Sequence, residues 1–402
     1  MQPFSRVPIT AGGDNGAVTR IRGSYRTGRA RAEEILAAAQ ELFIAEGYGA
    51  TSLRGIAAAV GISHPALLRY FPTKGDVLTA LVRKLDVQAS AWLDGSGDSD
   101  STVPGPGDIA RRSQATPGWV ELFTALLGEA TSPEHPGHEL MLGRRHAGLA
   151  LVQRLLAPFS PDDDSARVEA LRLAALWDGL QILSLYFPGE IDLPGHLDAY
   201  AEEIEAHGVP RSRLPTARSA DEGPAEGGAA RSRRRVVIEA AARRYALSGY
   251  YGASMRSVAE EAGVSLAALI HIAPTKEALL HLVVSELFAE NLEDSLDWMM
   301  SWMSSIGDRP RWLNAAQVVL LCEATVPSHP AHDALRARLA AGREVARASL
   351  EGSGVADDVA RPVADGLVAL ALGSIVGWMY DGWEADPAVV LGDTVTRVLR
   401  QP

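Results

Sequence analysis

The segment from Gly61 to Lys74, GISHPALLRYFPTK, gathers side chains that can bind phosphate groups and base edges. His64, Arg69 and Tyr70 carry hydrogen-bond donors or acceptors, and Lys74 adds a positive charge. Cationic and polar groups around a helix N-terminus suit an anionic, hydrogen-bonding surface such as a nucleic acid duplex. The remainder of the sequence decides whether such a surface is what these residues serve.

The distribution of charge supports this interpretation. The whole chain has a formal net charge of −12, yet residues 1–80 carry +3 and residues 231–285 carry +4, which leaves −19 on the remainder. Two locally basic segments in an acidic chain are typical of modules that contact nucleic acid. A generally high arginine content explains the same excess, so charge alone does not decide the question.

An internal repeat organises the chain. Residues 47–82 align with residues 249–284 at a constant offset of 202, with 14 identities in 36 positions and no gap. A second pair of similar segments, EATSPEHPGHEL from Glu129 and EATVPSHPAHDAL from Glu323, follows at an offset of 194. Two such pairs in the same order indicate that a two-part unit is duplicated.

Each unit is predicted to be helical. Apolar residues make up 47% of the chain, with Ala and Leu prominent over β-branched residues, and this composition favours helices. A first helix is predicted to end before Gly47, and one face of it carries the apolar set at helical spacing. That set is Ile35, Leu36, Ala39, Leu42 and Phe43.

The next two elements follow the plan of a helix-turn-helix motif. A short helix, TSLRGIAAAV, has Thr51 or Ser52 as its N-cap and ends at Gly61. Ser63 caps a third helix, which has a proline in its first turn and ends at Pro72. Two short helices joined by a tight glycine turn are typical of this motif.

Longer amphipathic helices are predicted after each motif, so the expected fold is all-α in two tandem units. The predicted helices cover residues 76–93, 117–131, 139–156, 165–187, 194–207, 277–304, 309–325, 332–351, 357–380 and 387–400, with a loop at 94–108. The predicted domains are an arm (1–27), a helix-turn-helix domain (28–75), a helical domain (76–207), a linker (208–230), a second helix-turn-helix domain (231–277) and a second helical domain (278–402).

The motif order resembles that of the TetR family of bacterial transcriptional regulators, whose usual chain is about half this length. The resemblance rests on EGYGATSLRGIA, then VGIS, then ALLRYFPTK, then a long helix, and it returns in the second half. It implies a ligand-responsive DNA-binding regulator, most often a repressor. The DNA-contacting positions that it assigns in the first unit are Arg54, Ser63, His64, Pro65, Arg69, Tyr70 and Lys74, whereas Leu68 departs from the tyrosine usual there.

The second motif is degenerate. Leu266, Ala267 and Ile272 replace His64, Pro65 and Tyr70. The DNA-contacting positions that remain there are Arg256, Ser265, His271 and Lys276. We expect this unit to contact phosphates while reading little sequence, or to have lost DNA binding and survive as a structural half.

The resemblance also implies how the two units are arranged. Family members pair two identical chains through their last two helices. Here the last two helices of each half are predicted to pack within one chain as an intramolecular pseudo-dimer, with a further homodimer possible but not required.

A small apolar or aromatic effector is expected in the helical domains. The candidate residues are Trp119, Phe123, Trp298 and Trp302. For the Trp/Met stripe that contains Trp298 and Trp302, core packing is the alternative role.

No enzymatic, cofactor or metal site is predicted. The chain has no phosphate loop, dinucleotide-binding glycine pattern, nucleophile elbow or HExxH motif. The histidines of HPGH and HPAH fall at an expected helix start, where a polar cap is ordinary. A single cysteine, Cys322, and no signal or membrane-spanning segment lead us to expect a cytoplasmic protein. The alternative function is a helical ligand- or protein-binding module whose motifs no longer bind specific DNA.

Overall fold

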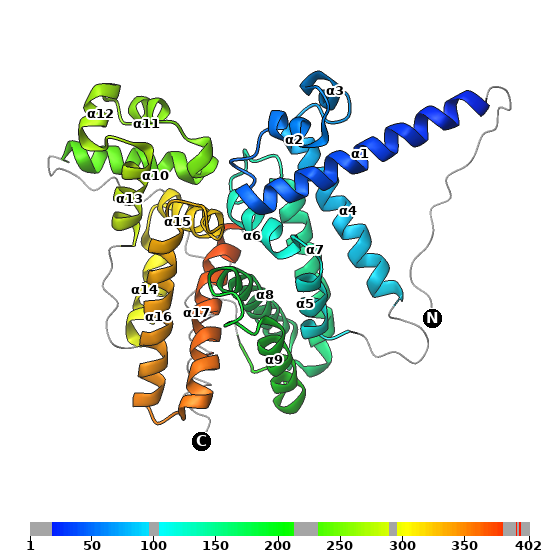
Figure 1. Cartoon of the computed structure of the whole chain (residues 1–402). Coiled ribbons are helices and arrows are strands. Elements are labelled where there is room, and N and C mark those ends of the chain that lie inside the picture. The colour runs from blue at the N-terminus through cyan, green and yellow to red at the C-terminus, as the bar shows by residue number, and fades with distance from the viewer. Residues whose placement is uncertain are drawn as a thin grey trace.

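The computed structural model describes residues 18–95, 104–212, 232–288 and 296–380, together with Leu391 and Thr394. Every regular element in these ranges is a helix, which confirms the predicted all-α class (Figure 1). The first unit contains α1 (Val18–Glu46), α2 (Leu53–Val60), α3 (His64–Leu68), α4 (Lys74–Gly95), α5 (Pro106–Ala115), α6 (Trp119–Glu129), α7 (His138–Leu156), α8 (Asp163–Tyr186) and α9 (Leu193–His207). The second contains α10 (Arg233–Gly252), α11 (Met255–Glu261), α12 (Leu266–Ile272), α13 (Lys276–Leu287), α14 (Leu296–Ser305), α15 (Arg311–Glu323), α16 (His332–Gly352) and α17 (Asp357–Tyr380).

Several predicted boundaries differ from the structure. The expected arm 1–27 is already helical from Val18, because no proline interrupts the propagation of α1 toward its N-terminal end. The helix predicted over 277–304 ends at Leu287, and α14 starts separately at Leu296. The predicted loop 94–108 contains the start of α5, where Asp108 accepts a hydrogen bond from the Gly105 amide at 3.1 Å.

The predicted linker and last helix lie mainly outside the described residues. At the start of the linker, residues 208–212 pack back on the body, and the Ser212 amide donates to the Ser165 hydroxyl at 3.0 Å. The rest of the predicted linker and residues 387–400, apart from Leu391 and Thr394, are not among the described residues.

The offset of 194 found in the sequence is also the offset between equivalent helices. Helices α7 and α16 begin at His138 and His332, and α8 and α17 span Asp163–Tyr186 and Asp357–Tyr380. The ends of α6 and α15, Glu129 and Glu323, have the same offset, so side chains 194 positions apart can be compared directly from α6 to α8 and from α15 to α17.

Helices α8 and α17 pack along each other at the centre of the molecule (Figure 1). Gly179 of α8 lies against the backbone of Ala369, and Gly373 of α17 lies against the backbone of Ala175. Gly373 is the equivalent of Gly179, and Ala369 is the equivalent of Ala175, at the offset of 194. The two contacts therefore join the same pair of equivalent positions in opposite directions. Such an exchange of equivalent partners is what a two-fold axis produces in a dimer of identical subunits.

Helix α17 is apolar and buried. Within the described ranges it is the single unbroken helix whose length and composition would suit a membrane span, but most of that span is covered by protein. It contacts α8, α15 and α16. Its hydrophobicity therefore serves the packed core of the two units.

Candidate nucleic-acid interface and ligand cavity

The first helix-turn-helix motif is built by the capping residues that the sequence predicts. The Ser52 hydroxyl accepts from the Gly55 amide at 3.0 Å and caps α2. Gly61 ends α2 with φ of 70°, a left-handed conformation that favours glycine. Ser63 then caps α3 by accepting from the Ala66 amide at 3.3 Å. These contacts fix the angle at which α3 leaves the turn.

Most of the predicted DNA-contacting side chains of the first unit are exposed on this motif. Arg54, Ser63, Pro65 and Arg69 are exposed, and Tyr70 keeps 39% of its surface accessible. His64 is half-buried at the start of α3. Leu67 and Phe71 point inward and belong to the core, so the polar and apolar faces of the recognition segment are cleanly separated.

The second motif repeats the geometry with a different surface. Ser254 caps α11 and Ser265 caps α12 through the Ser257 and Ala268 amides. Arg256, Ser265 and His271 are exposed. The exposed face of α12 also carries Leu266 and Ile270, with 37% and 45% of their surfaces accessible. This helix therefore presents few groups that can hydrogen-bond to base edges.

Lys74, predicted to bind phosphate, is directed inward in the structure. Its ammonium group donates to the carbonyl oxygens of Tyr48 (2.8 Å), Gly49 (3.3 Å) and Thr51 (3.1 Å), which uses all three of its donors. It also lies 4.2 Å from the centroid of the Tyr48 ring. Burial lowers the pKa of Lys74, although the charges of Glu129 and Glu323 oppose that shift.

Lys276 takes the equivalent place in the second unit with fewer contacts. Its ammonium donates to the Tyr251 carbonyl at 3.3 Å and lies 4.4 Å from the Tyr250 ring centroid. Both lysines thus join the start of the following helix, α4 or α13, to the loop that precedes the motif. A phosphate contact by either lysine stays a prediction.

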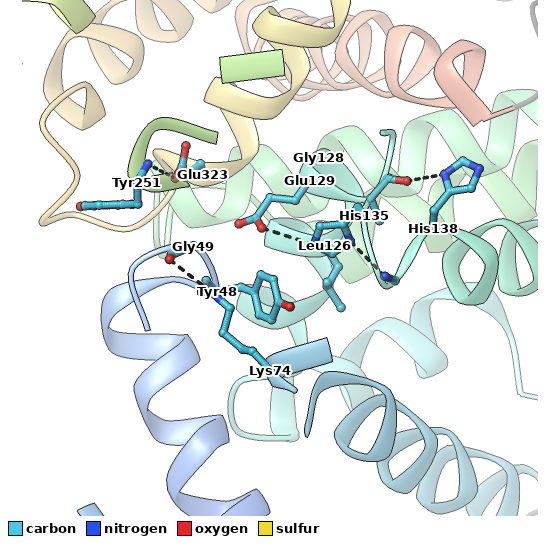
Figure 2. A network of polar contacts seen from close by, with 12 residues as sticks. Tyr48, Gly49, Lys74, Leu126, Gly128, Glu129, His135, His138, Tyr251 and Glu323 are labelled. Atoms are coloured by element: carbon cyan, nitrogen blue, oxygen red, sulfur yellow. Dashed lines mark hydrogen bonds and ion pairs between the residues drawn. The ribbon is translucent and has the colours of Figure 1, made fainter. Parts of the chain in front are cut away.

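Two buried glutamates lie behind these loops, where the two units meet (Figure 2). An alanine Cβ at Gly49 would lie 3.1 Å from Glu323 Oε1 and 3.6 Å from Glu129 Oε1, which places both carboxyl groups beside one glycine. Glu323 accepts from the amides of Tyr250 (2.6 Å) and Tyr251 (3.2 Å). Glu129 Oε1 has no hydrogen-bond partner within the part of the chain that the structure describes.

The close approach of two buried carboxyl groups raises the pKa of Glu323 to about 8. Burial is the larger cause, the charge of Glu129 is the second, and the Tyr250 and Tyr251 amides oppose both. In the sequence these glutamates begin the two repeated segments that contain HPGH and HPAH. Their presence at the same place in both repeated segments was the signal that could have identified a shared structural role.

The histidines of HPGH and HPAH organise the turn after each glutamate. His138 Nδ1 lies 2.8 Å from the Ala130 carbonyl oxygen, and His332 Nδ1 lies 2.8 Å from that of Ala324. Burial lowers the pKa of His329 to about 4, with the charges of His332 and Lys276 as further causes. Within the described ranges, no group of three or more metal-ligating side chains is assembled.

A cavity of about 90 Å³ opens in the helical domain of the second unit. Its walls come from α13 to α17, with Ile182 of α8 closing one side. Trp302, predicted as an effector-binding residue, lines this cavity. The side chain of Trp298, predicted with it, lies outside the described residues.

The two aromatic residues predicted in the first unit do not line this cavity. Trp119 and Phe123 pack on each other with ring centroids 4.4 Å apart. The Arg144 guanidinium lies 4.4 Å from the Phe123 ring centroid. Phe123 thus belongs to the core and Trp119 packs against it, and an effector contact by either stays a prediction.

Two capped helix-turn-helix motifs on one helical body define the class of this protein as DNA-binding. The sequence model of the bacterial regulatory proteins of the tetR family matches residues 35–81 and residues 237–283, which are the two motifs with their flanking helices. A search of curated proteins finds no match for the chain. The chain therefore carries two DNA-binding domains of the tetR family in tandem, as the sequence predicted.

Proposed function

We propose that this protein is a transcriptional repressor of the cytoplasm that binds its operator through the first helix-turn-helix motif and is released by a small apolar or aromatic effector. The observation that carries the proposal is the exposed set around the capped N-terminus of α3. That set is Arg54, Ser63, Pro65, Arg69 and Tyr70, with His64 half-buried beside it. Cationic groups hold phosphates, and polar groups near the helix start reach base edges in the major groove.

The proposal includes one chain acting as an intramolecular pseudo-dimer. The exchanged contacts of α8 and α17 support it, because they are those of a two-fold interface formed inside one chain. Both motifs also lie at the same end of the molecule in Figure 1. A further homodimer is compatible with this arrangement but is not needed to present two motifs.

The proposal predicts an asymmetric operator. A homodimer reads both half-sites with the same helix, so its operator is nearly palindromic. Here α3 begins with His64 and is followed directly by the exposed Arg69 and Tyr70, whereas α12 exposes Leu266 and Ile270. One half-site is therefore expected to be sharply specified, and the other to tolerate substitution.

Selection of bound sequences from random DNA, followed by a base-by-base scan, tests the proposal. Light scattering of the complex gives the number of chains on the DNA. We expect one chain on one specified half-site, and loss of selection in the Arg69→Ala, Tyr70→Ala double variant. The matched control is Leu266→Ala in α12, which should retain the preferred sequence. Two inverted, equally constrained half-sites with two chains bound would contradict the pseudo-dimer and leave DNA binding itself intact.

The alternative is a ligand- or protein-binding module that no longer recognises specific DNA. The observation that favours it is the exposed apolar face of α12, because exposed apolar side chains at a recognition helix suit a protein partner better than a phosphate backbone. Failure of the selection to enrich any sequence, from a chain shown to be folded, would favour this alternative. An operator in which α3 specifies bases would exclude it.

A further inference from the structure

The cavity of the second unit occupies a place that bulky side chains fill in the first unit. Gln317 and Ala371 line the cavity, and the residues 194 positions earlier are Phe123 and Trp177. Phe123 is buried against Trp119, and Trp177 packs on the hydrophobic core. Replacing two aromatic rings by an amide and a methyl group removes the atoms that would otherwise occupy this volume. The cavity therefore results from a difference in sequence between two units that share one fold.

The walls of the cavity are mainly apolar. Aliphatic side chains such as Leu321, Val368 and Ile375 form most of the surface, with Met299 and Trp302 on the side of α14. Such a surface binds an apolar body, because burial of apolar area is favourable and methionine adapts to the shape of a ligand. Among the lining residues, Gln317 and Arg338 carry the strongly polar groups.

The orientation of the Gln317 amide sets the polarity that a ligand needs. Its Nε2 donates to the Leu287 carbonyl oxygen at 2.6 Å, and a carbonyl oxygen can only accept, so the oxygen of the amide must be the opposite atom. That atom, Oε1, is buried and has no hydrogen-bond partner within the described residues. A buried acceptor without a partner destabilises the folded protein, and a donor on a ligand would relieve that cost.

The size of the cavity limits the ligand to a small framework. An engineered apolar cavity of about 150 Å³ in another protein binds benzene. The cavity here, at about 90 Å³, is of the same order and admits a single ring.

We infer that the second unit binds one neutral, single-ring apolar compound that donates an O–H or N–H hydrogen bond to Gln317 Oε1. The inference rests on the proposed ligand response and adds the site, the chemical class and the number of ligands per chain. The first unit does not share the site, because Phe123 and Trp177 stand where Gln317 and Ala371 would be needed.

Phenol and toluene are suitable probes, since they match in size and differ in one donor group. Their binding to the full chain is measured by ligand-observed NMR or calorimetry. The wild-type protein is expected to bind phenol about 3–10 times more tightly than toluene, which corresponds to one net hydrogen bond. In Gln317→Leu this preference should fall to one or reverse. Ala371→Trp should weaken both probes at least tenfold by restoring the ring that the first unit has.

The matched control is Val359→Trp, which adds the same side chain at an exposed position of α17 and should leave both affinities unchanged. Circular dichroism shows whether each variant is folded, and Ala371→Leu replaces Ala371→Trp if the larger change unfolds the protein. Benzoate is the competing probe, because Arg338 lies in the wall.

Three results would overturn the inference. The first is that the wild type binds toluene as tightly as phenol or more tightly. The second is that it binds benzoate more tightly than phenol. The third is that Ala371→Trp, or Ala371→Leu in its place, binds phenol as tightly as the wild type does. Absence of binding by all probes would overturn it as well. The selection of DNA sequences is measured on the same protein without any probe added. A failure to bind the probes can therefore be distinguished from a failure to bind DNA.

Discussion

Tyr186 of α8 donates its hydroxyl to the carbonyl oxygen of Leu321, at 2.8 Å, and so joins the first unit to α15 of the second. The reciprocal bond runs from the Tyr380 hydroxyl to the Leu127 carbonyl at 3.0 Å. Each tyrosine ring also stacks on a histidine of the other unit, Tyr186 on His332 and Tyr380 on His138. Because the bonds are exchanged between units and buried, they specify the register of the interface as well as stabilising it.

The glycines at the crossing of α8 and α17 are expected to tolerate no side chain. In Gly179→Ala or Gly373→Ala, the new Cβ would overlap the backbone carbonyl group of Ala369 or Ala175, and a backbone cannot move aside as a side chain can. Each substitution should lower the free energy of unfolding by roughly 3 kcal/mol in urea denaturation. The double variant should cost less than the sum, since one displacement of α17 relieves both overlaps.

The control for this prediction is Gly148→Ala in α7, where an added Cβ meets no atom within 4 Å. That change should stabilise the protein by about 0.5–1 kcal/mol, because alanine is the better helix former. Equal effects at positions 148 and 179 would show that α8 and α17 do not cross as closely as described.

Lys74 is expected to contribute to the free energy of unfolding, whether or not it also contacts DNA. Lys74→Met leaves the carbonyl oxygens of Tyr48, Gly49 and Thr51 without their donor, so the free energy of unfolding should fall by about 2 kcal/mol. Lys276→Met removes one longer bond, to Tyr251, and should cost less than half as much.

Thermal or urea unfolding of both variants measures this difference. The control is Lys84→Met, which removes a partly exposed ion pair to Glu33 with atoms 3.1 Å apart and should change stability by less than about 1 kcal/mol. If the free energy of unfolding fell equally in all three variants, the hydrogen bonds of Lys74 to the three carbonyl oxygens would not contribute to stability beyond the presence of a positive charge.

The sequence predicted the helices and turns of the motifs better than the tertiary contacts that their side chains make. Glycines, serine caps and apolar spacing act over a few neighbouring residues, so α2, α3 and their turn were predictable, including the left-handed Gly61. Whether a lysine turns outward or inward depends on carbonyl oxygens 23 to 26 positions away, as for Lys74, and no local pattern carries that information. The cavity could not be predicted from local sequence either, because it depends on which residues of the first unit are equivalent to Gln317 and Ala371, and the offset of the helices establishes that equivalence.

A similar limit applies to the carboxyl pair. Glu129 and Glu323 each end an apolar helix, a place where an acidic residue is usually solvated and unremarked. Only the packing of α6 on α15 brings both into the interior and near each other. Pairings across units separated by nearly 200 positions are set by tertiary structure alone.

Arg256 and Lys276 should differ in their effect on the salt dependence of DNA binding. Arg256 is exposed at the start of α11, whereas Lys276 bonds to the Tyr251 carbonyl. Arg256→Gln is expected to reduce the slope of log K against log salt by about 0.9, the value for one phosphate contact, without changing the preferred sequence. If Lys276 keeps its inward bond on DNA, Lys276→Gln should leave the slope unchanged. An equal reduction would show that this lysine turns outward and makes the phosphate contact that the sequence predicts.

His64 is the residue of the first unit whose change should alter sequence preference. His64→Ala is expected to relax selection at one base pair by about 1–3 kcal/mol while leaving the salt slope unchanged. A base-by-base scan of the selected operator measures this. The comparison is His271→Ala on α12, an exposed residue whose loss should affect no base pair by that amount.

The pair of buried glutamates predicts that the protein loses stability as the pH rises toward 8. Glu323 has a pKa of about 8 in the folded protein, against an ordinary value of 4.5, so the folded state holds a proton that the unfolded state releases. Stability from that proton is complete below the ordinary pKa and is lost as the pH rises through the folded one. His329, with its pKa lowered from 6.5 to about 4, opposes this trend at lower pH, because there the unfolded state binds the extra proton.

A comparison of the wild type with Glu323→Gln over about pH 6.5 to 8 isolates the contribution of Glu323, because both proteins keep His329. In this window the free energy of unfolding of the wild type should fall, by at most about 1.4 kcal/mol per pH unit. Glu323→Gln has no proton to lose, keeps an acceptor for the Tyr250 and Tyr251 amides, and should show little change over the same window. Urea denaturation at half-unit steps of pH, on both proteins at constant ionic strength, makes the comparison. Parallel curves for the two proteins would mean that Glu323 titrates alike in the folded and unfolded states, and that its position beside Glu129 costs nothing.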